Sequence, residues 1–390
     1  MSSLPLDQER RRAPAYHPRP GRFSDPRVAL VHYWLVAMRG GERVIERLLG
    51  LYPQADIFTH IYDPSRMSET IRKASVQTSF IERLPFSHRL YQYYLPLMPS
   101  ALEQLDLGGY DLVISSEAGP AKGVITSPDS LHVCYCHSPM RYLWDQYHVY
   151  RKAASPLARM AMPLFYSRLR QWDVSSSSRV DRIAANSSYI QRRIRKVWNR
   201  GAAVIHPPVD TSLFWQSPEV EPFYLWVGQF VPYKRPDLAV EAFNKTGLPL
   251  KMVGTGSMLK ELRQKARPNI EFIERMDFDG LRSMYAKARA YIITAEEDFG
   301  ITPVEAMASG RPVIAFGRGG VLDTVIPDVT GLFFDRQEPD DLVAAVEHME
   351  QEHGYFDPAA LRMQADNFAP DRFDQGIAQL TCPDGNTRWN

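Results

Sequence analysis

Short apolar runs alternate with helical patterns along this chain, and after one proline-rich segment the alternation starts again. In the first half the apolar runs lie at 28–31, 56–62, 111–116, 132–137, 182–185 and 202–206. In the second half they lie at 223–227, 250–253, 270–273, 290–294, 312–316 and 331–334, with helical patterns at 42–51, 236–244, 280–288 and 339–350. Continuous apolar runs of this length are typical of parallel strands buried on both faces, with helices as crossovers. The pattern predicts an α/β chain of two doubly wound, Rossmann-like domains.

The domain boundaries follow from chain length and from the proline-rich segment. A chain of 390 residues exceeds one ordinary hydrophobic core. Residues 207–222 begin with Pro207-Pro208 and are polar, which is typical of a stiff linker. We predict a disordered polar tail at 1–26, an N-terminal domain at 27–206, a C-terminal domain at 223–366, and a crossover helix with a tail at 367–390. Because ligands of such sheets bind at the carboxyl ends of the strands, we expect a site where the two domains face each other.

Charge and cysteine content narrow the class of protein. A net charge of +1 gives no overall reason to expect a nucleic-acid partner. Cys134 and Cys136 alternate along a predicted strand, so they share one face as small apolar side chains and have no zinc-like spacing. No apolar run approaches the ~18 residues of a membrane span. We therefore expect a soluble protein of a reducing compartment, with only peripheral membrane contact.

Two glutamates, Glu297 and Glu305, flank the point where a predicted strand runs into a short helix. Thr302 is the expected N-cap and Pro303 the first helical residue. Free backbone N–H groups before such a helix are suited to phosphate. Since Glu305 lies three residues after Thr302, a capping box with a purely stabilising glutamate is an equal alternative. A solvated loop charge is the alternative for Glu297.

Other turns after strands bring glycines and cations to the same edge. Gly40-Gly41 follows the first strand and would let the backbone approach a diphosphate. Lys234 or Arg235, after the 223–227 strand, would neutralise phosphate charge. Gly254 lies in a further turn. Each has an ordinary alternative, a simple turn or a surface cation, but their recurrence favours a nucleotide site.

The segment after the 132–137 strand carries groups suited to a sugar. His137 ends that strand, where it is either catalytic or structural. Flat rings and charged hydrogen-bonding groups follow at Arg141, Tyr142, Trp144 and Asp145, which are the expected acceptor-binding residues. Packing against the next helix is their alternative role.

Two further stretches, 80–98 and 159–172, combine aromatic side chains with arginines. Such surfaces favour peripheral binding to a bilayer, although helices with extended arginines also occur in plain protein surfaces. No nucleic-acid-binding motif accompanies them.

Taken together, Glu297-Asp298-Phe299-Gly300, the segment from Glu305 to Gly310, the Lys234 turn and Gly40-Gly41 resemble the retaining GT-B glycosyltransferases of family 4. The resemblance covers nearly all of residues 27–370. Segments 32–35, 38–42 and 135–144 resemble those of bacterial mannosyltransferases that build O-antigen and exopolysaccharide repeat units on a polyprenyl diphosphate lipid. The resemblance implies GDP-mannose as donor substrate, a polyprenyl-diphosphate-linked saccharide as acceptor, no cofactor, no metal, and a cytoplasmic location at the inner face of the cytoplasmic membrane.

By position, the resemblance implies a role for each residue. Glu297 would bond hydroxyls of the hexose, His137 would contact that sugar, and Lys234 would bind the phosphates; these are the expected catalytic residues. Glu305 would hold the ribose, and Gly40-Gly41 would approach from the other domain. The remaining donor-side positions are Gln229, Arg235, Gly254 and the amides of Phe299, Gly300 and Ile301. The departing phosphate is expected to take the acceptor's proton on the same face, so catalysis would be mostly positioning and phosphate stabilisation.

One position departs from the family pattern. Many relatives carry arginine where this chain has Gln229, so one positive charge is missing from the phosphate site, and Arg235 is the candidate to replace it. Two other functions stay open on the sequence alone. One is an isomerase such as a nucleotide-sugar 2-epimerase on the same fold, and the other is a non-catalytic nucleotide-sugar-binding protein.

Overall fold

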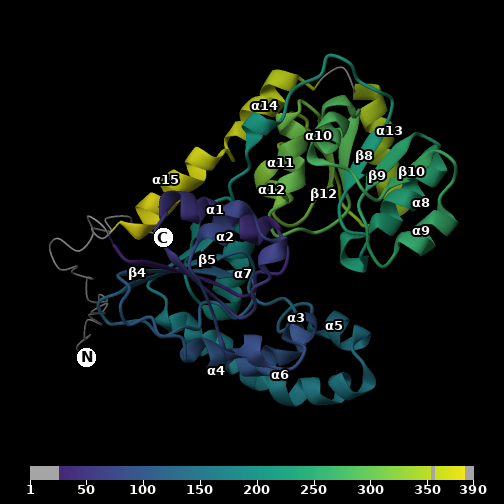
Figure 1. The fold of residues 1–390 in the computed structure, drawn as a ribbon. Helices are drawn as coiled ribbons and strands as arrows, with labels where there is room; N and C mark the ends of the chain where they lie inside the picture. The colour runs from purple at the N-terminus through teal and green to yellow at the C-terminus, as the bar shows by residue number, and fades with distance from the viewer. Residues whose placement is uncertain (1–25, 353–355, 383–390) are drawn as a thin grey trace, which may run out of the picture.

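The computed structural model describes residues 26–352 and 356–382. Within these ranges the chain forms two parallel sheets, each covered by helices on both faces (Figure 1). The predicted α/β architecture with two doubly wound domains is confirmed. Residues 1–25 of the predicted tail at 1–26, and residues 383–390 of the predicted C-terminal segment at 367–390, lie outside the described residues.

The N-terminal sheet has the strand order β3-β2-β1-β4-β5-β6-β7, and all its neighbours are parallel. The chain reverses its direction of travel across the sheet between β1 and β4, which places a topological switch point there. Its strands are β1 (Val28–His32), β2 (Asp56–Thr59), β3 (Val76–Thr78), β4 (Leu112–Glu117), β5 (Leu131–Cys136), β6 (Arg182–Ala185) and β7 (Ala203–Val204). Its helices are α1 (Gly40–Leu51), α2 (Glu69–Lys73), α3 (Ser87–Leu90), α4 (Met98–Glu103), α5 (Tyr147–Ala153), α6 (Pro156–Ser176) and α7 (Ser188–Trp198).

The C-terminal sheet has the order β10-β9-β8-β11-β12-β13, again parallel throughout. Its switch point lies between β8 and β11. The strands are β8 (Tyr224–Val227), β9 (Leu250–Val253), β10 (Ile270–Ile273), β11 (Ala290–Ile293), β12 (Val313–Phe316) and β13 (Gly331–Phe334). The helices are α8 (Pro236–Thr246), α9 (Leu259–Lys265), α10 (Phe278–Lys287), α11 (Ile301–Ala308), α12 (Val321–Thr324) and α13 (Pro339–Glu352).

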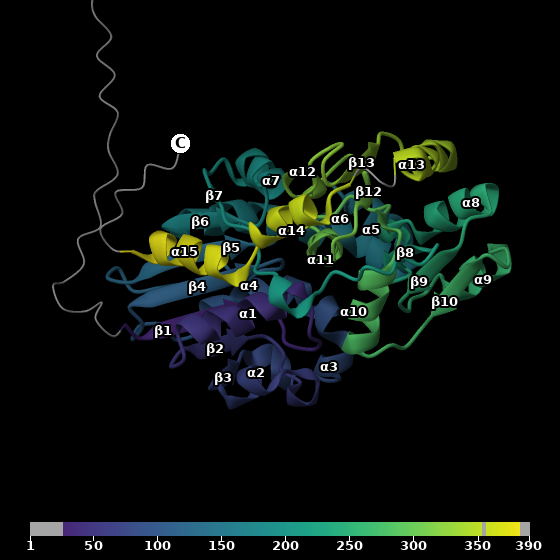
Figure 2. The ribbon, with the colours of Figure 1, turned by 90° about the horizontal axis from the view of Figure 1, so that it is seen from above.

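Two more helices lead from the C-terminal domain back to the N-terminal one. α14 (Pro358–Asp366) packs on α11, and α15 (Pro370–Thr381) lies on the N-terminal sheet, as the yellow diagonal in Figure 1 and the view in Figure 2 show. Phe373, Ile377 and Leu380 of α15 are buried in the same apolar cluster as residues of β1 and β5. An ion pair between Arg47 and Asp374, with 2.8 Å from Nε to Oδ1, fixes α15 to α1. The core of the N-terminal domain therefore includes residues 373–380.

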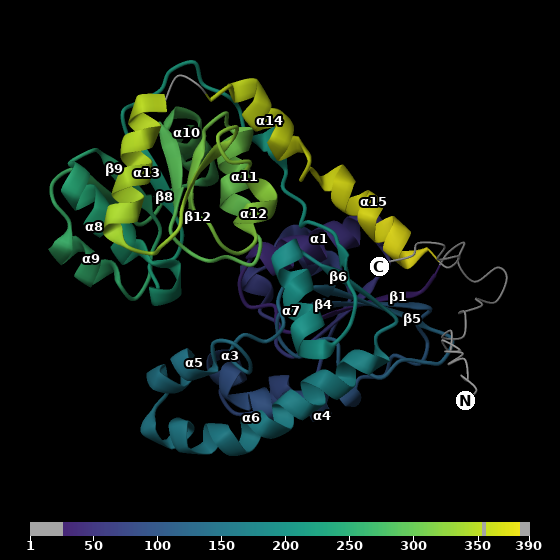
Figure 3. The same cartoon turned by 180° about the vertical axis from the view of Figure 1, so that it is seen from behind.

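Helices α3, α5 and α6 form an arm that extends from the N-terminal domain below the C-terminal one (Figure 3). Its base is an apolar cluster that includes Ile81, Met98, Met140 and Leu169. The arm thus has a core of its own, separate from the sheet.

Several predicted boundaries were wrong in detail. The 56–62 strand ends at Thr59, the 202–206 strand is reduced to Ala203–Val204, and β3 and α14 had no sequence prediction. β3 and β7 are short edge strands, and their few residues carry too little periodicity to be recognised.

Candidate active site

The loops that leave β8 and β11, the two strands at the switch point of the C-terminal sheet, bring Lys234 and Glu297 together. Their Nζ and Oε1 atoms are 2.8 Å apart. The Thr294 hydroxyl donates to the carbonyl of Lys234 at 2.8 Å and so joins the two loops. Burial favours the neutral amine, but the charge of Glu297 outweighs it and raises the pKa of Lys234. Lys234 is therefore a fixed cation at the carboxyl edge of this sheet.

Helix α11 begins directly after these loops, two residues earlier than the capping pattern predicts. Gly300 is the N-cap, with a φ of 90°, and Ile301 is the first helical residue. Only glycine adopts such a φ without strain, so the chain can turn into the helix at this point. Thr302 is inside the helix, where its hydroxyl accepts from Tyr291 at 2.7 Å. The predicted N-cap at Thr302 and its capping box with Glu305 were wrong.

Glu305 lies inside α11, only 6% exposed, and its partners are tertiary. The hydroxyl of Tyr285 donates to Oε2 at 3.1 Å, and Arg43 of α1 reaches Oε1 at 3.5 Å. Burial raises the pKa of Glu305, although Arg43 opposes the shift. A buried carboxylate with one neutral donor and one distant cation keeps hydrogen-bonding capacity for a ligand.

The first turn of α1 in the N-terminal domain faces the first turn of α11. A Cβ added to Gly40 would lie 3.3 Å from Cδ1 of Ile301, and one added to Gly41 would lie 3.1 Å from the Tyr33 hydroxyl. The sequence analysis placed the two glycines in a turn before the helix, but α1 starts at Gly40 and includes both. Two helix N-termini thus meet between the domains, an arrangement that favours an anion, although at α1 the N-cap amide of Arg39 already donates to Glu42 at 3.0 Å.

His137 follows β5 close to this point, 3.7 Å from a Cβ placed on Gly41. Its Nε2 is 2.8 Å from Ser116 Oγ, which lies 3.0 Å from Nδ1 of His32, and Nε2 of His32 lies 3.7 Å from Glu42. Burial, with a smaller contribution from His32, lowers the pKa of His137 to about 3. His137 is therefore a neutral hydrogen-bonding group near pH 7. Sequence reasoning missed the supporting residues His32, Ser116 and Glu42, which lie on other elements.

The four residues expected to form a sugar-binding face do not form one open surface. Arg141 pairs with Asp298 of the other domain, and Asp145 pairs with Arg193. Trp144 donates its indole N–H to Asp173 at 2.8 Å, and the buried hydroxyl of Tyr142 has no hydrogen-bond partner among the described residues. Both rings pack against the apolar base of the arm. Packing, the alternative role given for these residues, describes the half-buried rings of Tyr142 and Trp144 better than an exposed sugar-binding face.

The remaining donor-side residues are placed as follows. Gln229 is exposed, and Arg235 directs its Nε to both oxygens of Asp237, at 3.0 and 3.2 Å, so it does not replace the charge missing at 229. A Cβ on Gly254 would lie 1.8 Å from the carbonyl oxygen of Gly228, so this glycine permits two loops to pack closely. The ring of Phe299 is buried and stacks on His206 with centroids 5.3 Å apart.

A buried ionic cluster beneath the site was not predicted. Lys122 pairs with Asp173 and lies 3.5 Å from Glu117, and all three side chains are fully buried. Burial raises the pKa of Glu117 to about 7, although Lys122 opposes the shift. A glutamate ending the apolar 111–116 run was the signal available in the sequence.

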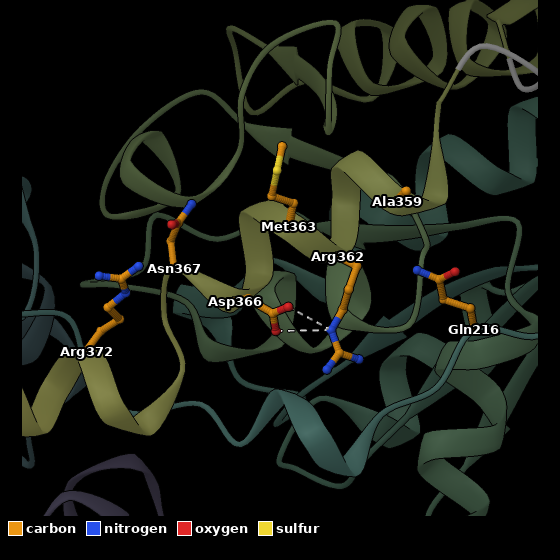
Figure 4. A pocket seen from close by; sticks show the side chains of 7 residues that line it. All are labelled: Gln216, Ala359, Arg362, Met363, Asp366, Asn367 and Arg372. Carbon is orange, nitrogen blue, oxygen red and sulfur yellow. Dashed lines mark hydrogen bonds and ion pairs between the residues drawn. The ribbon is translucent and has the colours of Figure 1, made fainter.

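A cavity of about 490 Å³ lies elsewhere, beside α14 (Figure 4). Its lining includes Gln216, Arg362 and Asp366, and Arg362 pairs with Asp366 at 3.0 Å. None of the predicted site residues lines it. In the part of the chain that the structure describes, no group of three or more His, Cys, Asp or Glu side chains is arranged to hold a metal ion.

Comparison with known proteins agrees with this geometry. Residues 38–213 match the model of Glycosyltransferase Family 4, and residues 212–368 match that of Glycosyl transferases group 1. The chain is 33% identical over 205 residues to a GDP-mannose-dependent alpha-mannosyltransferase of Mycolicibacterium smegmatis, covering 49% of this chain and 54% of that protein. It is 31% identical over 192 residues to the mouse GDP-Man:Man(3)GlcNAc(2)-PP-Dol alpha-1,2-mannosyltransferase, covering 40% and 39%.

The curated relatives match over a part of their length only, about half or less. Among solved structures, Anabaena HepE in complex with UDP superposes with a TM-score of 0.67 at 17% identity, covering 90% of this chain and 98% of that one. At this identity the likeness concerns the fold, and it confirms the predicted GT-B arrangement of two Rossmann-like domains.

Proposed function

We propose, on the premise that this chain is built as a family 4 glycosyltransferase of the GT-B fold, that it transfers mannose from GDP-mannose to a lipid-linked saccharide with retention of configuration. The observation that carries the proposal is the Lys234–Glu297 pair beside the facing N-termini of α1 and α11. It combines a cation and free amides, which suit a diphosphate, with a carboxylate, which suits sugar hydroxyls.

In this proposal the donor binds mainly to the C-terminal domain. Lys234 and the amides at the start of α11 hold the diphosphate, and the buried carboxylate of Glu305 accepts hydrogen bonds from the ribose hydroxyls. The 3.5 Å contact between Arg43 and Glu305 is weak, so a ribose can replace it at little cost.

The chemistry would depend on placing charge rather than on an acid and a base of the protein. Glu297 leaves its pairing with Lys234 for a hydroxyl of the hexose, and Lys234 turns to the departing phosphate, on which negative charge grows. His137, being neutral, bonds the sugar without giving it a proton. The phosphate then accepts the proton of the acceptor hydroxyl on the same face.

The donor and acceptor are proposed from the relatives. Two of them are named for GDP-mannose or GDP-Man, and a third, 28% identical over 151 residues, is the O-antigen chain mannosyltransferase of Salmonella typhimurium, covering 36% of this chain and 43% of that protein. Mannose on a polyprenyl-diphosphate-linked acceptor is the substrate pair that fits these names together.

The arm is the surface that we propose meets the membrane carrying this acceptor, at its cytoplasmic face. None of the described helices is both long enough and apolar enough to span a bilayer. Large apolar side chains nevertheless project from the arm, 72% to 76% exposed, at Phe86, Tyr93, Met160 and Leu164. Exposed arginines accompany them at Arg83, Arg89, Arg159 and Arg168. Apolar insertion combined with attraction to anionic headgroups is how peripheral surfaces bind.

The activity test uses purified protein with GDP-mannose, UDP-glucose or UDP-galactose, each with and without a polyprenyl-diphosphate-linked saccharide. We expect mannose transfer from GDP-mannose that requires the acceptor, and a product whose anomeric configuration, read by NMR, matches the donor. A changed nucleotide sugar in the absence of acceptor would instead identify an isomerase. Preference for a UDP-sugar would refute the mannose assignment, and binding without turnover would indicate a non-catalytic protein.

The membrane test compares Leu164→Asp with Met363→Asp, a matched control that is 72% exposed on α14. In co-sedimentation with vesicles containing anionic phospholipid, the arm variant should lose most of its bound fraction and the control should keep it. Equal binding of the two variants would refute the arm as the membrane surface.

A further inference from the structure

We propose that Arg141, a residue of the N-terminal domain, supplies to the donor's diphosphate the positive charge that position 229 lacks. The inference rests on the proposed function, because it assumes a nucleoside diphosphate sugar as donor. It assigns to the donor side a residue that the sequence pattern placed on the acceptor side.

The loop that leaves β8 brings one cation to the site. The structure describes all of its residues 228–235, and among them Lys234 is the one that pairs with Glu297. Gln229 is neutral and exposed, and Arg235 is committed to Asp237. A diphosphate carries at least two negative charges near pH 7, so one lysine leaves it poorly neutralised in a half-buried site.

Arg141 reaches this site from the opposite domain. It follows β5 and pairs with Asp298, the neighbour of Glu297 in the chain, and its side chain is only 16% exposed. Burial opposes its charge, but Asp298 and, more weakly, Glu297 raise the pKa of Arg141. The charge of Arg141 in turn works to lower the pKa of Lys234, against the larger effect of Glu297. The two cations therefore flank the same pair of acidic residues.

Arg141 retains capacity for a second acceptor. A guanidinium has five N–H donors, and in this structure Nε is buried without a hydrogen-bond partner among the described residues. Nearby Arg193 differs, since Ser138 accepts from it at 2.6 Å and Asp145 pairs with it as well. Arg141 can thus stay on Asp298 and still bond a phosphate, which makes it the better candidate of the two.

The Asp298 pairing makes this arginine ready for an anion. Asp298 holds the guanidinium at the start of α11, and it lies 3.5 Å from Arg193 as well. Because Arg193 also pairs with Asp145, the cations and carboxylates here balance. What Arg141 offers an incoming diphosphate is therefore the N–H donors that Asp298 does not use, held beside the start of α11.

The experiment measures the affinity for GDP by isothermal titration, with UDP as a parallel probe. Arg141→Gln should weaken GDP binding by about 10-fold to 100-fold, the effect of one charge-assisted hydrogen bond. Because the change leaves Asp298 with only the 3.5 Å contact to Arg193, the comparison is repeated in an Asp298→Asn background, where the loss of GDP affinity should persist. Arg336→Gln, at an exposed pair with Asp341, is the control and should bind as wild type.

Rescue separates a phosphate contact from a structural role. Gln229→Arg, which restores the charge from the other domain, should recover most of the GDP affinity in the Arg141→Gln protein. If Arg141→Gln does not fold, Arg141→Lys takes its place in the same comparison, and GDP binding should still weaken because the lysine lacks the fork of N–H donors that can bond Asp298 and a phosphate together. The KM for the acceptor should be unchanged by Arg141→Gln.

Three results would overturn the inference. These are unchanged GDP affinity on adding Arg141→Gln to Asp298→Asn, failure of Gln229→Arg to rescue, or an effect confined to the KM of the acceptor. In each case wild-type protein still binds GDP, so the proposed function survives. Wild-type protein that bound neither GDP nor UDP would overturn both together.

Discussion

Replacing Glu305 by glutamine should separate donor binding from folding. The carboxylate is 6% exposed and has two partners, the Tyr285 hydroxyl at 3.1 Å and Arg43 at 3.5 Å. Glutamine keeps an oxygen for Tyr285, so no buried hydroxyl is left unpaired. It loses the ion pair with Arg43, a residue whose side chain is 51% exposed, and such a pair contributes about 0–1 kcal/mol.

The change also removes a cost of burying charge. Burial raises the pKa of Glu305 in the folded protein above its ordinary value of 4.5. Because its pKa is raised on folding, Glu305 contributes favourably to the free energy of unfolding at low pH, and this contribution is lost as the pH rises through the folded pKa. At neutral pH the wild-type carboxylate is therefore unfavourable, and glutamine relieves it. The two effects oppose each other, so we expect Glu305→Gln to change stability by less than about 1 kcal/mol.

Donor affinity should behave differently. Hydrogen bonds from ribose hydroxyls to a charged acceptor contribute about 1.5–3 kcal/mol, so GDP should bind about 10-fold to 100-fold more weakly. Glu305→Ala should lose the same affinity and also about 1–3 kcal/mol of stability, because it leaves the Tyr285 hydroxyl without an acceptor. Urea unfolding and isothermal titration measure the two quantities, with Glu338→Gln at an exposed position as control. A Glu305→Gln protein that bound GDP normally but was clearly destabilised would refute the argument and return Glu305 to a structural role.

Three further predictions concern catalysis, the buried ionic cluster and pH. Glu297→Ala should lower kcat by about 10²–10³ with a much smaller change in GDP affinity, and steady-state kinetics showing a change in KM alone would contradict this. Lys122→Met should destabilise the protein by about 3–5 kcal/mol in urea unfolding, since it leaves Asp173 buried without a counter-ion, and a loss below about 1 kcal/mol would speak against the cluster. Stability should fall as the pH drops from 6.5 towards 4. Burial lowers the pKa of His60 and His137 to about 3 and that of His132 to about 4, so these side chains take up protons on unfolding. Urea unfolding that gave the same stability throughout this pH range would contradict the prediction.

The sequence predicts those features that depend on neighbouring residues. Apolar runs identify the buried strands, and the turns after β8 and β11 place Lys234 and Glu297 at one edge of the sheet once the strand order is doubly wound. The helix start at Gly300 was missed because Thr302, Pro303 and Glu305 form a convincing local cap. The positive φ of a glycine, which decides the matter, leaves no periodic signal.

Contacts between distant parts of the chain were beyond such reasoning. Arg141 and Asp298 are 157 residues apart in sequence, and Arg43 and Glu305 are 262 apart. Each pair forms only because two domains meet at a particular angle. Tyr142 and Trp144 also depend on distant contacts, since their composition suits a sugar and the structure packs both half-buried rings against the apolar base of the arm.

The return of α15 to the N-terminal sheet has a consequence for how the protein is made. Residues 373–380 belong to the core that β1 begins, so this core stays incomplete on the ribosome until almost the whole described chain has been synthesised. The C-terminal domain, whose strands are contiguous in sequence, can assemble while its partner still waits. Once both domains are formed, the chain crosses between them twice, at residues 207–222 and between α14 and α15. These two connections allow the domains to rotate relative to each other and prevent their separation.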